Sequence, residues 1–174
     1  NVQVDVCFSA DKSTKATFTC YEKENWAEGY DVIIHDECSA DIKDLTVVNR
    51  ILAPHRKGVP GVNLHCAMHC YRTAASVAKP VATGTDGSLW FDYLGLQSSG
   101  HGKQLPIEVV YADPASPITH GLENWTTIKE ELYNNISVHP GAKPLAKGKQ
   151  GQAETIVVWT NEYGNKKTRV FSTT

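Results

Sequence analysis

The chain has 174 residues, with 17 basic and 19 acidic side chains, a formal net charge of -2 and 41% hydrophobic residues. This composition is typical of one soluble domain with enough apolar side chains for a core, and it excludes collagens, coiled coils and disordered tails. The balanced charge excludes binding to nucleic acid by phosphate neutralisation alone. No apolar run approaches the roughly 20 residues that cross a bilayer, so we expect neither a nucleic-acid nor a membrane partner.

Five cysteines cannot all pair in disulfides, so at least one thiol is free. They are also too sparse to form the disulfide framework of a small secreted domain. The sequence shows no basic and apolar leader, and we expect any targeting segment to have been removed or to lie outside this chain. The compartment therefore stays open between the cytoplasm and the periplasm.

The first part of the chain alternates predicted strands with a predicted helix. Residues 2–8 alternate apolar and polar side chains in the period of a half-buried strand. Residues 32–35 form a short apolar run that is typical of a strand covered on both faces by helices. From residue 41, apolar residues recur at helical spacing and Gly58 supplies a C-terminal stop.

A second buried strand is predicted over residues 61–65 and leads directly into a predicted helix over 66–78, which is rich in helix formers. Strands that alternate with helices favour a doubly wound α/β fold with a mostly parallel sheet. In such folds the sites lie at the carboxyl ends of the strands, which is where His65 stands.

The second part of the chain is less regular. Residues 98–102 are typical of a flexible loop around His101, and residues 105–111 alternate like a strand. Residues 155–160 and 168–171 predict a C-terminal hairpin with turn residues between them. Since no linker or repeat divides the chain, we expect a single domain over residues 1–174.

The densest group of reactive side chains follows the second buried strand. On a helix, His65 would share a face with His69, and Cys66 would share one with Cys70. Imidazole and thiolate are ligands that suit zinc, so His65, His69 and a third ligand, His101 or His35, are candidate metal ligands. The alternative is that the cysteines are small buried residues and the histidines are only hydrogen-bonded. The sequence predicts no nucleotide cofactor.

The same junction is similar to a nucleophile elbow, in which a sharp turn from strand to helix exposes a reactive side chain. A helix N-terminus and a neighbouring histidine would favour the thiolate form of Cys66, which makes this residue a candidate nucleophile. The glycines that flank such an elbow are missing here. The elbow position itself therefore points to His65 as much as to Cys66.

Further polar residues are candidates for acid–base chemistry and for substrate binding. Glu131, beside Tyr133, is a candidate general base or a group that orients a histidine, although Glu130 and Glu131 also fit a solvated acidic pair. Because adjacent strand residues point apart, we expect at most one of these carboxylates to face a site. Arg72 suits either an anionic group of a substrate or a surface salt bridge.

Aromatic and amide side chains also gather near the end of the chain. Trp159, Asn161 and Tyr163 lie at the end of the strand predicted over residues 155–160, and would suit the ring of a sugar. The alternative for Trp159 is a place in the core.

Several segments resemble, in order, the ThuA-like (trehalose utilisation) family of the class I glutamine-amidotransferase-like superfamily. The matching segments are Gly-Tyr-Asp-Val-Ile-Ile at 29–34, Gly-Val-Pro-Gly-Val-Asn-Leu-His at 58–65, Gly-His-Gly at 100–102, Ile-Glu-Val at 107–109, Asp-Pro at 113–114, Ser-Pro-Ile-Thr at 116–119, Gly-Leu at 121–122, Glu-Glu-Leu-Tyr at 130–133, Val-Val-Trp at 157–159, Glu-Tyr-Gly at 162–164 and Arg-Val-Phe at 169–171. Each motif is weak alone, but their order along most of the chain is specific.

The resemblance implies a flavodoxin-like three-layer sandwich in which a histidine, here His65, replaces the elbow cysteine of true amidotransferases. It implies sugar catabolism, often of oxidised (3-keto) disaccharides, with His65, His101, Glu131 and Tyr133 at the positions of the family's polar pocket residues. Cys66, His69, Cys70 and Arg72 depart from the commonest form of the family. The resemblance also implies a strand and helix before Val2 and a further C-terminal segment, both of which lie outside this chain.

These observations favour an enzyme of carbohydrate metabolism that acts on a sugar or keto-sugar by histidine- or metal-assisted proton transfer or hydrolysis. One alternative is a Cys66 thiol hydrolase of the amidotransferase type, and another is a non-catalytic carbohydrate-binding or scaffold domain. The expected partner is a small sugar, and self-association into a homo-oligomer is compatible with the sequence.

Overall fold

A computed structural model describes all residues from Asn1 to Thr174 and shows one mixed sheet of seven strands in the order β1-β2-β7-β6-β5-β3-β4. The strands are β1 (Ile33–His35), β2 (Gly61–Leu64), β3 (Leu96–Tyr111), β4 (Trp125–Val138), β5 (Lys143–Gln150), β6 (Ala153–Tyr163) and β7 (Thr168–Thr173). The helices are α1 (Leu45–Arg56) and α2 (Leu89–Leu94), with short 3-10 turns at Thr19–Glu22, His65–His69 and Asp86–Ser88. None of the helices is long and apolar enough to cross a membrane.

The predicted doubly wound, flavodoxin-like sandwich is wrong. Only β1, β2 and β7 are parallel neighbours, and every other pairing in the sheet is antiparallel. The reason lies in the connections, because parallel neighbours need a crossover and antiparallel neighbours need only a short turn. Helix α1 is such a crossover between β1 and β2, whereas the long strands after α2 follow one another without any helix.

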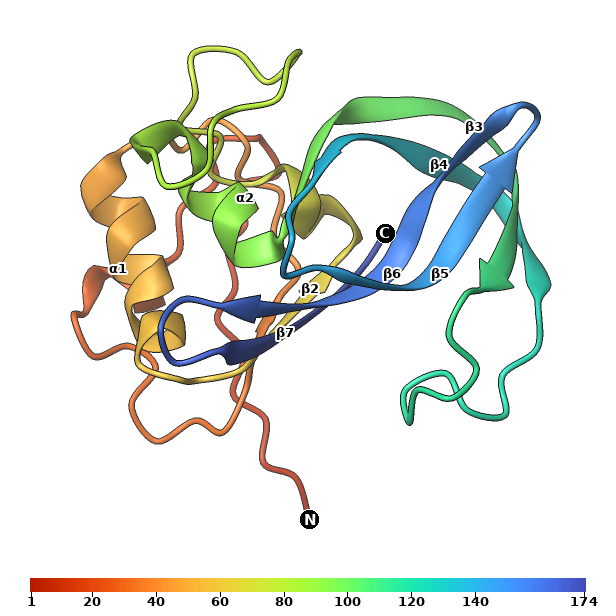
Figure 1. Cartoon of the computed structure of the whole chain (residues 1–174). Helices are drawn as coiled ribbons and strands as arrows, with labels where there is room; N and C mark the ends of the chain where they lie inside the picture. Colours follow the sequence, from red (N-terminus) through yellow and green to blue (C-terminus); the bar gives the residue numbers. More distant parts are fainter.

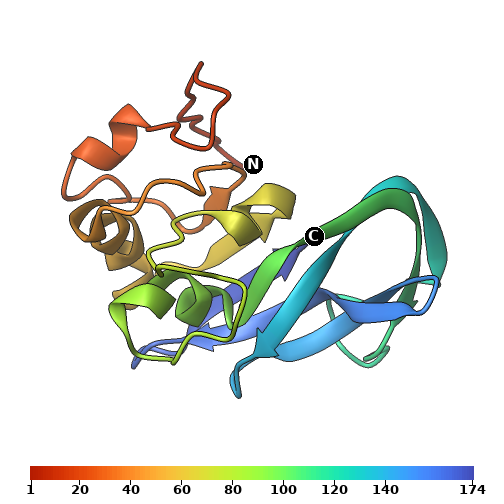
Figure 2. The same cartoon turned by 90° about the horizontal axis from the view of Figure 1, so that it is seen from above.

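The two helices and the irregular first part of the chain lie at the end of the molecule where β1, β2 and β7 pair (Figure 1). The long strands β3 and β4 pair over most of their length and curve away from the helices, as the view from above shows (Figure 2). The molecule thus has a helix-covered end and an extended antiparallel end.

Helix α1 confirms the predicted helical pattern. The Asp44 side chain caps its first turn by accepting hydrogen bonds from the backbone N–H of Thr46 at 2.7 Å and of Val47 at 3.4 Å. Its buried face carries Val48, Ile51, Leu52 and His55, at the spacing of one helical stripe. Gly58, just after the helix, has a φ of 110°, which a residue with a Cβ rarely adopts.

The predicted strand over residues 2–8 does not form. Val2, Val4, Val6 and Phe8 are 89%, 72%, 83% and 78% exposed, and no strand pairs with this segment. Alternating side chains favour a strand, but a strand also requires a neighbouring backbone with which to bond. A disulfide between Cys7 and Cys20 joins this segment to the first 3-10 turn.

The predicted helix over residues 66–78 is also absent, since the helical turn stops at His69. Tyr71 adopts a left-handed φ of 49°, and its N–H donates to the carbonyl of Ser39 at 3.0 Å. Its hydroxyl donates to Glu37 Oε1 at 2.7 Å in the interior. Tertiary hydrogen bonds thus replace the helical bonds that propensity alone would favour.

Two further predictions are corrected in β3 and β1. Residues 98–102 belong to β3, where bulges interrupt the register between Ser98, His101 and Gln104, and do not form a free loop. β1 is an edge strand whose Ile34 is 60% exposed, so helices do not cover both of its faces. The C-terminal hairpin is confirmed, because β6 and β7 pair antiparallel from Val158 and Thr173 to Tyr163 and Thr168.

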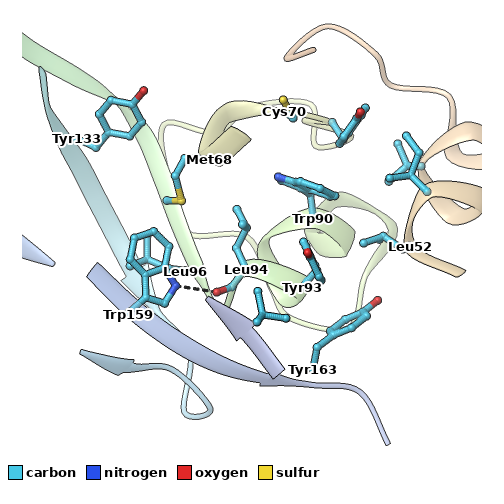
Figure 3. Close-up of a cluster of buried hydrophobic side chains, with 14 residues drawn as sticks. Leu52, Met68, Cys70, Trp90, Tyr93, Leu94, Leu96, Tyr133, Trp159 and Tyr163 are labelled. Carbon is cyan, nitrogen blue, oxygen red and sulfur yellow. Dashed lines mark hydrogen bonds between the residues drawn. The ribbon is translucent and has the colours of Figure 1, made fainter. Parts of the chain in front are cut away.

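The main core lies between the two helices and the middle of the sheet (Figure 3). Trp90 and Trp159 are its largest side chains, and each indole N–H is bonded to a backbone carbonyl, of Ala67 at 2.7 Å and of Leu94 at 2.8 Å. These bonds satisfy the polar atoms of side chains that otherwise contribute apolar area. The carbonyl acceptors come from the turn after β2 and from α2, so the core fixes the position of that turn.

Candidate active site

His65 stands at the carboxyl end of β2 in a strained backbone conformation. Its φ is 42°, in the left-handed region, and the 3-10 turn begins at this residue. Non-glycine residues adopt this region rarely, and they often do so at functional sites. The elbow position predicted at this junction therefore belongs to His65, and Cys66 follows it.

The two nitrogens of the His65 ring have different surroundings: Nδ1 has polar neighbours, and Nε2 has no hydrogen-bond partner. Its Nδ1 lies 3.2 Å from the hydroxyl oxygen of Tyr133 and 3.5 Å from the sulfur of Cys66. Its Nε2 is buried without a hydrogen-bond partner and lies 3.7 Å from Glu130 Oε2. Burial raises the pKa of Tyr133 well above its ordinary value, so this hydroxyl stays protonated.

A second histidine–glutamate pair lies near Tyr133. His101 Nε2 is 3.6 Å from Glu131 Oε2, and His101 is the register partner of Tyr133 across β3 and β4. Register shifts, which are typical of β-bulges, occur on both sides of His101. Both glutamates thus reach histidines around Tyr133, whereas the sequence predicted that at most one would face a site.

The backbone explains why two adjacent glutamates reach one cluster. The N–H of Glu131 donates to Glu130 Oε2 at 3.0 Å, so the Glu130 side chain folds back along the strand. Side chains of adjacent strand residues normally point to opposite faces, but a side chain that bonds to the next backbone N–H lies along the strand instead.

His69 stacks on Tyr133, with ring centroids 4.4 Å apart and planes that differ by 9°. Its Nε2 lies 2.9 Å from the hydroxyl oxygen of Ser98. Burial, and to a lesser degree the charges of Arg72, His101 and His65, lower the pKa of His69 to about 3. His69 is therefore neutral near pH 7, and in this structure its ring packs against Tyr133.

The three candidate metal ligands His65, His69 and His101 all surround Tyr133, as the ring centroid distances of 5.3, 4.4 and 5.9 Å show. However, no three His, Cys, Asp or Glu side chains place their ligand atoms around one point. As placed, these residues do not form a ligand set for zinc, which needs three or four converging atoms. Zinc binding stays a prediction of the spacing, and we derive no step through a metal.

The cysteines of the turn have different surroundings. The Cys70 thiol is buried, donates to the carbonyl of Glu37 at 2.9 Å and accepts from the N–H of Ser39 at 3.0 Å. Burial raises the pKa of Cys70 well above its ordinary value, which makes it unreactive. Cys66 is half-buried beside His65, and Cys38 is exposed.

The aromatic group predicted to bind a sugar lies in the core. Trp159 is fully buried, and the amide of Asn161 donates to the carbonyls of Asp92 at 3.2 Å and Tyr93 at 3.0 Å. The hydroxyl of Tyr163 accepts from Arg56 Nε at 3.1 Å. The structure does not bring these three residues to the histidine cluster as a surface for a ligand. Glu130, which lies near His65 Nε2, was not chosen from the sequence because the family resemblance assigned the pocket glutamate to Glu131.

No family model and no curated protein matches the sequence. Among solved structures, a protein described as ThuA-like from Bacteroides uniformis ATCC 8492 superposes with a TM-score of 0.59 at 16% identity, over 88% of this chain and 61% of that one. The chain shares the fold of a ThuA-like protein. The cytoplasmic protein STM1381 from Salmonella typhimurium LT2 superposes with a TM-score of 0.56 at 10% identity, over 83% and 60% of the two chains.

A β-galactosidase from Rahnella sp. R3 also matches, with a TM-score of 0.56 at 18% identity, over 88% of this chain and 21% of that one. At these identities the likeness concerns the fold alone. The chain spans about three fifths of the length of the first two structures.

Proposed function

We propose that this protein is an enzyme of carbohydrate metabolism that binds a sugar or keto-sugar and transfers a proton with His65. The observation that carries the proposal is the geometry of the His65 ring, whose Nε2 is buried without a hydrogen-bond partner while Tyr133 orients its Nδ1. A base must be held in one orientation and keep one nitrogen available, and this arrangement provides both.

The mechanism uses the two ring nitrogens differently. In the tautomer with the proton on Nδ1, that N–H donates to the Tyr133 oxygen and leaves a lone pair on Nε2. Nε2 takes a proton from a hydroxyl group of the sugar or from the carbon next to a keto group. The imidazolium that forms is stabilised by the Glu130 carboxylate, whose Oε2 lies 3.7 Å away. It then returns the proton to the substrate as a general acid.

The surroundings of the pair support this chemistry. The side chains of His65 and Glu130 are each 37% exposed, so a small substrate can reach the pair, but it reaches the buried Nε2 only after a neighbouring side chain moves aside. The His101–Glu131 pair lies near Tyr133, with a ring centroid distance of 5.9 Å, and would supply a second donor and acceptor for sugar hydroxyls. A carbohydrate substrate is supported by the ThuA-like and β-galactosidase neighbours, which share the fold.

The decisive experiment measures proton exchange. The protein is incubated with sugars and keto-sugars in D2O, and deuterium incorporation next to the carbonyl is followed by NMR. We expect exchange with the wild type and a loss of about 100-fold with His65→Gln, the scale of one general base. His120→Gln, at an exposed histidine distant in sequence from the cluster, is the matched control and should keep the wild-type rate.

Three outcomes would contradict the proposal. An equal rate in His65→Gln would remove His65 from the chemistry. Turnover that is abolished in Cys66→Ser but kept in His65→Gln would instead support the thiol hydrolase. A sugar that raises the melting temperature without any turnover would support a non-catalytic binding domain.

A further inference from the structure

The five cysteines of the chain fall into three groups. Cys7 and Cys20 are joined in a disulfide, and the thiol of Cys70 is buried and bonded to the backbone on both sides. Cys38 is exposed and Cys66 is half-buried, and both are free thiols. Cys38 and Cys66 are therefore the cysteines that remain accessible for reaction in the folded protein.

Cys38 and Cys66 follow two neighbouring parallel strands. The register of β1 and β2 ends with His35 opposite Asn63, and each cysteine lies three residues beyond its member of this pair. The backbones of neighbouring strands lie about 4.8 Å apart. The two cysteines therefore leave the sheet side by side, at the carboxyl ends of β1 and β2.

The Cys70 sulfur joins the two segments after they leave the sheet. It donates to the carbonyl of Glu37 at 2.9 Å and accepts from the N–H of Ser39 at 3.0 Å, so it contacts the backbone on both sides of Cys38. The same sulfur lies 3.8 Å from the carbonyl oxygen of Cys66. One buried atom is thus in contact with the backbone next to Cys38 and with the backbone of Cys66.

Backbone hydrogen bonds extend this contact. The N–H of Tyr71 donates to the carbonyl of Ser39 at 3.0 Å, and the N–H of Arg72 donates to the carbonyl of Ala40 at 3.4 Å. The segment that follows Cys38 is therefore bonded to the segment that follows the 3-10 turn, and these bonds hold Cys38 beside that turn.

The surroundings of the two thiols agree with this placement. Desolvation of the Cys38 sulfur, and to a lesser degree the neighbouring thiol of Cys66, raise the pKa of Cys38 to about 12. The Cys66 sulfur also lies 3.5 Å from His65 Nδ1. Cys66 therefore has Cys38 as one neighbour and the candidate base of the active site as another.

We infer that Cys38 and Cys66 form a redox-sensitive pair, which a small-molecule disulfide such as oxidised glutathione converts into a disulfide bond beside His65. The bond draws the Cys66 sulfur toward Cys38 and away from the imidazole, and so slows the proton transfer by His65. The formation of the bond goes beyond the proposed function, whereas the slower proton transfer rests on it.

The bond forms in two exchange steps. The Cys66 thiolate attacks one sulfur of oxidised glutathione, forms a mixed disulfide and releases one glutathione, which takes up the proton that Cys66 lost. The Cys38 thiolate then attacks the Cys66 sulfur, forms the internal disulfide and releases the second glutathione, which takes up the proton of Cys38. Two electrons thus pass from the two protein thiols to the glutathione.

The state of Cys38 favours this order of steps. The thiolate is the attacking form, and the raised pKa of Cys38 keeps its thiol protonated at the start. Once Cys66 is part of the mixed disulfide, it no longer carries the thiol that contributes to this shift. Cys38 then loses its proton more readily and attacks the neighbouring sulfur.

The test treats the folded protein with oxidised glutathione, alkylates the remaining thiols and maps the disulfides by mass spectrometry of peptides. We expect a new cross-link between Cys38 and Cys66, next to the Cys7–Cys20 disulfide that is present before treatment. In Cys38→Ser, Cys66 should stop at the mixed disulfide with glutathione, because no second thiol attacks it. If Cys38→Ser does not fold, the map of the wild type decides alone.

Two results of the map would overturn the inference. One is a glutathione adduct that persists on Cys66 in the wild type, because Cys38 would then not lie within reach. The other is a cross-link of Cys66 with Cys70 in place of Cys38, because the buried thiol would then be the partner.

Proton exchange in D2O measures the effect on the candidate active site. Oxidation should slow exchange in the wild type by about tenfold, the scale of a small displacement of a catalytic group, and dithiothreitol should restore the rate. Because dithiothreitol also reduces the Cys7–Cys20 disulfide, Cys38→Ser in dithiothreitol is the control. It should exchange at the rate of the untreated wild type.

Failure of the inference and failure of the proposed function give different results. Exchange that depends on His65, without any cross-link between Cys38 and Cys66, would overturn the inference and leave the proposed function intact. A cross-link without exchange in either redox state would support the pair and contradict the proposed function. A cross-link with an unchanged exchange rate would overturn the effect of the bond on His65.

Discussion

The Nε2 atoms of His35 and His55 lie 3.0 Å apart in the core, where both side chains are fully buried. His55 Nδ1 lies 2.7 Å from the carbonyl of Val59, which can only accept, so this nitrogen carries the proton. Burial, together with the charge of His35, lowers the pKa of His55 to about 3, which keeps the ring neutral and leaves its Nε2 as an acceptor. His35 Nε2 must therefore donate.

The other nitrogen of His35 also donates, because Nδ1 faces Glu37 Oε1 at 2.9 Å. Burial alone would raise the pKa of Glu37, but the charge and hydrogen bond of His35 and the hydroxyl of Tyr71 outweigh it and lower the pKa to about 2. Glu37 is thus a carboxylate that accepts, and His35 carries protons on both nitrogens. A buried imidazolium–carboxylate pair links β1 to α1 through His55.

Glu37→Gln should destabilise the protein by about 3 kcal/mol or more, because removal of one partner leaves the other charge buried and unpaired. Urea unfolding at pH 7, followed by circular dichroism, measures the change. Glu24→Gln, at an exposed position, is the control and should leave the midpoint within error. A midpoint that does not move in Glu37→Gln would show that His35 is not charged in the folded protein.

The free energy of unfolding should fall as the pH drops below about 6.5. His55 and His69 have pKa values lowered to about 3, so below pH 6.5 the unfolded chain binds protons that the folded chain does not. At pH 5.5 each buried ring costs up to about 1.4 kcal/mol, and less for the more accessible His69. Urea unfolding at pH 7.5 and 5.5 measures the loss.

His69→Gln removes one of these two groups and should make the pH dependence less steep, while His120→Gln should not change it. Glu37 affects the free energy of unfolding in a separate pH range. Its contribution is full above about pH 4.5 and is lost as the pH falls toward 2. Equal stability at pH 7.5 and 5.5 would contradict the neutral, buried state of both histidines.

Tyr133→Phe should lower kcat more than it raises KM in the exchange reaction. The change removes the oxygen that faces His65 Nδ1 at 3.2 Å and keeps the ring that stacks on His69. His65 then loses its orientation, and we expect a loss of about tenfold, less than for loss of the base itself. The pH profile of kcat/KM should shift as well, which a merely structural role of Tyr133 would not cause.

The three free cysteines should react with iodoacetamide at different rates. Cys38 is exposed and Cys66 is half-buried, whereas the Cys70 thiol is buried and bonded to the backbone on both sides. Mass spectrometry of the folded protein should show Cys70 modified last, and only after unfolding. Cys7 and Cys20 should react only after reduction, because they form a disulfide. Early modification of Cys70 would show that its turn opens in solution.

Some local features of the fold could be predicted from the sequence because only neighbouring residues cause them. The cap at Asp44 and the apolar stripe of α1 follow from neighbouring residues, as does the turn that joins β6 and β7. The left-handed φ at His65 also lies where the sequence predicted a sharp turn after a strand, and the chemistry of this position stays a prediction.

The parallel or antiparallel direction of the strands depends on tertiary contacts, because the pattern of side chains in a strand does not specify which other strand pairs with it. Residues 2–8 alternate apolar and polar side chains, but no strand pairs with them. Strand β5, which was not predicted from the sequence, pairs with both β3 and β6. Residues 66–78 have a high helical propensity but form no helix beyond His69, because long-range hydrogen bonds, such as those of Tyr71 with Ser39 and Glu37, hold the segment in another conformation. Those same bonds, between segments more than 30 residues apart, fix the backbone immediately before Arg72.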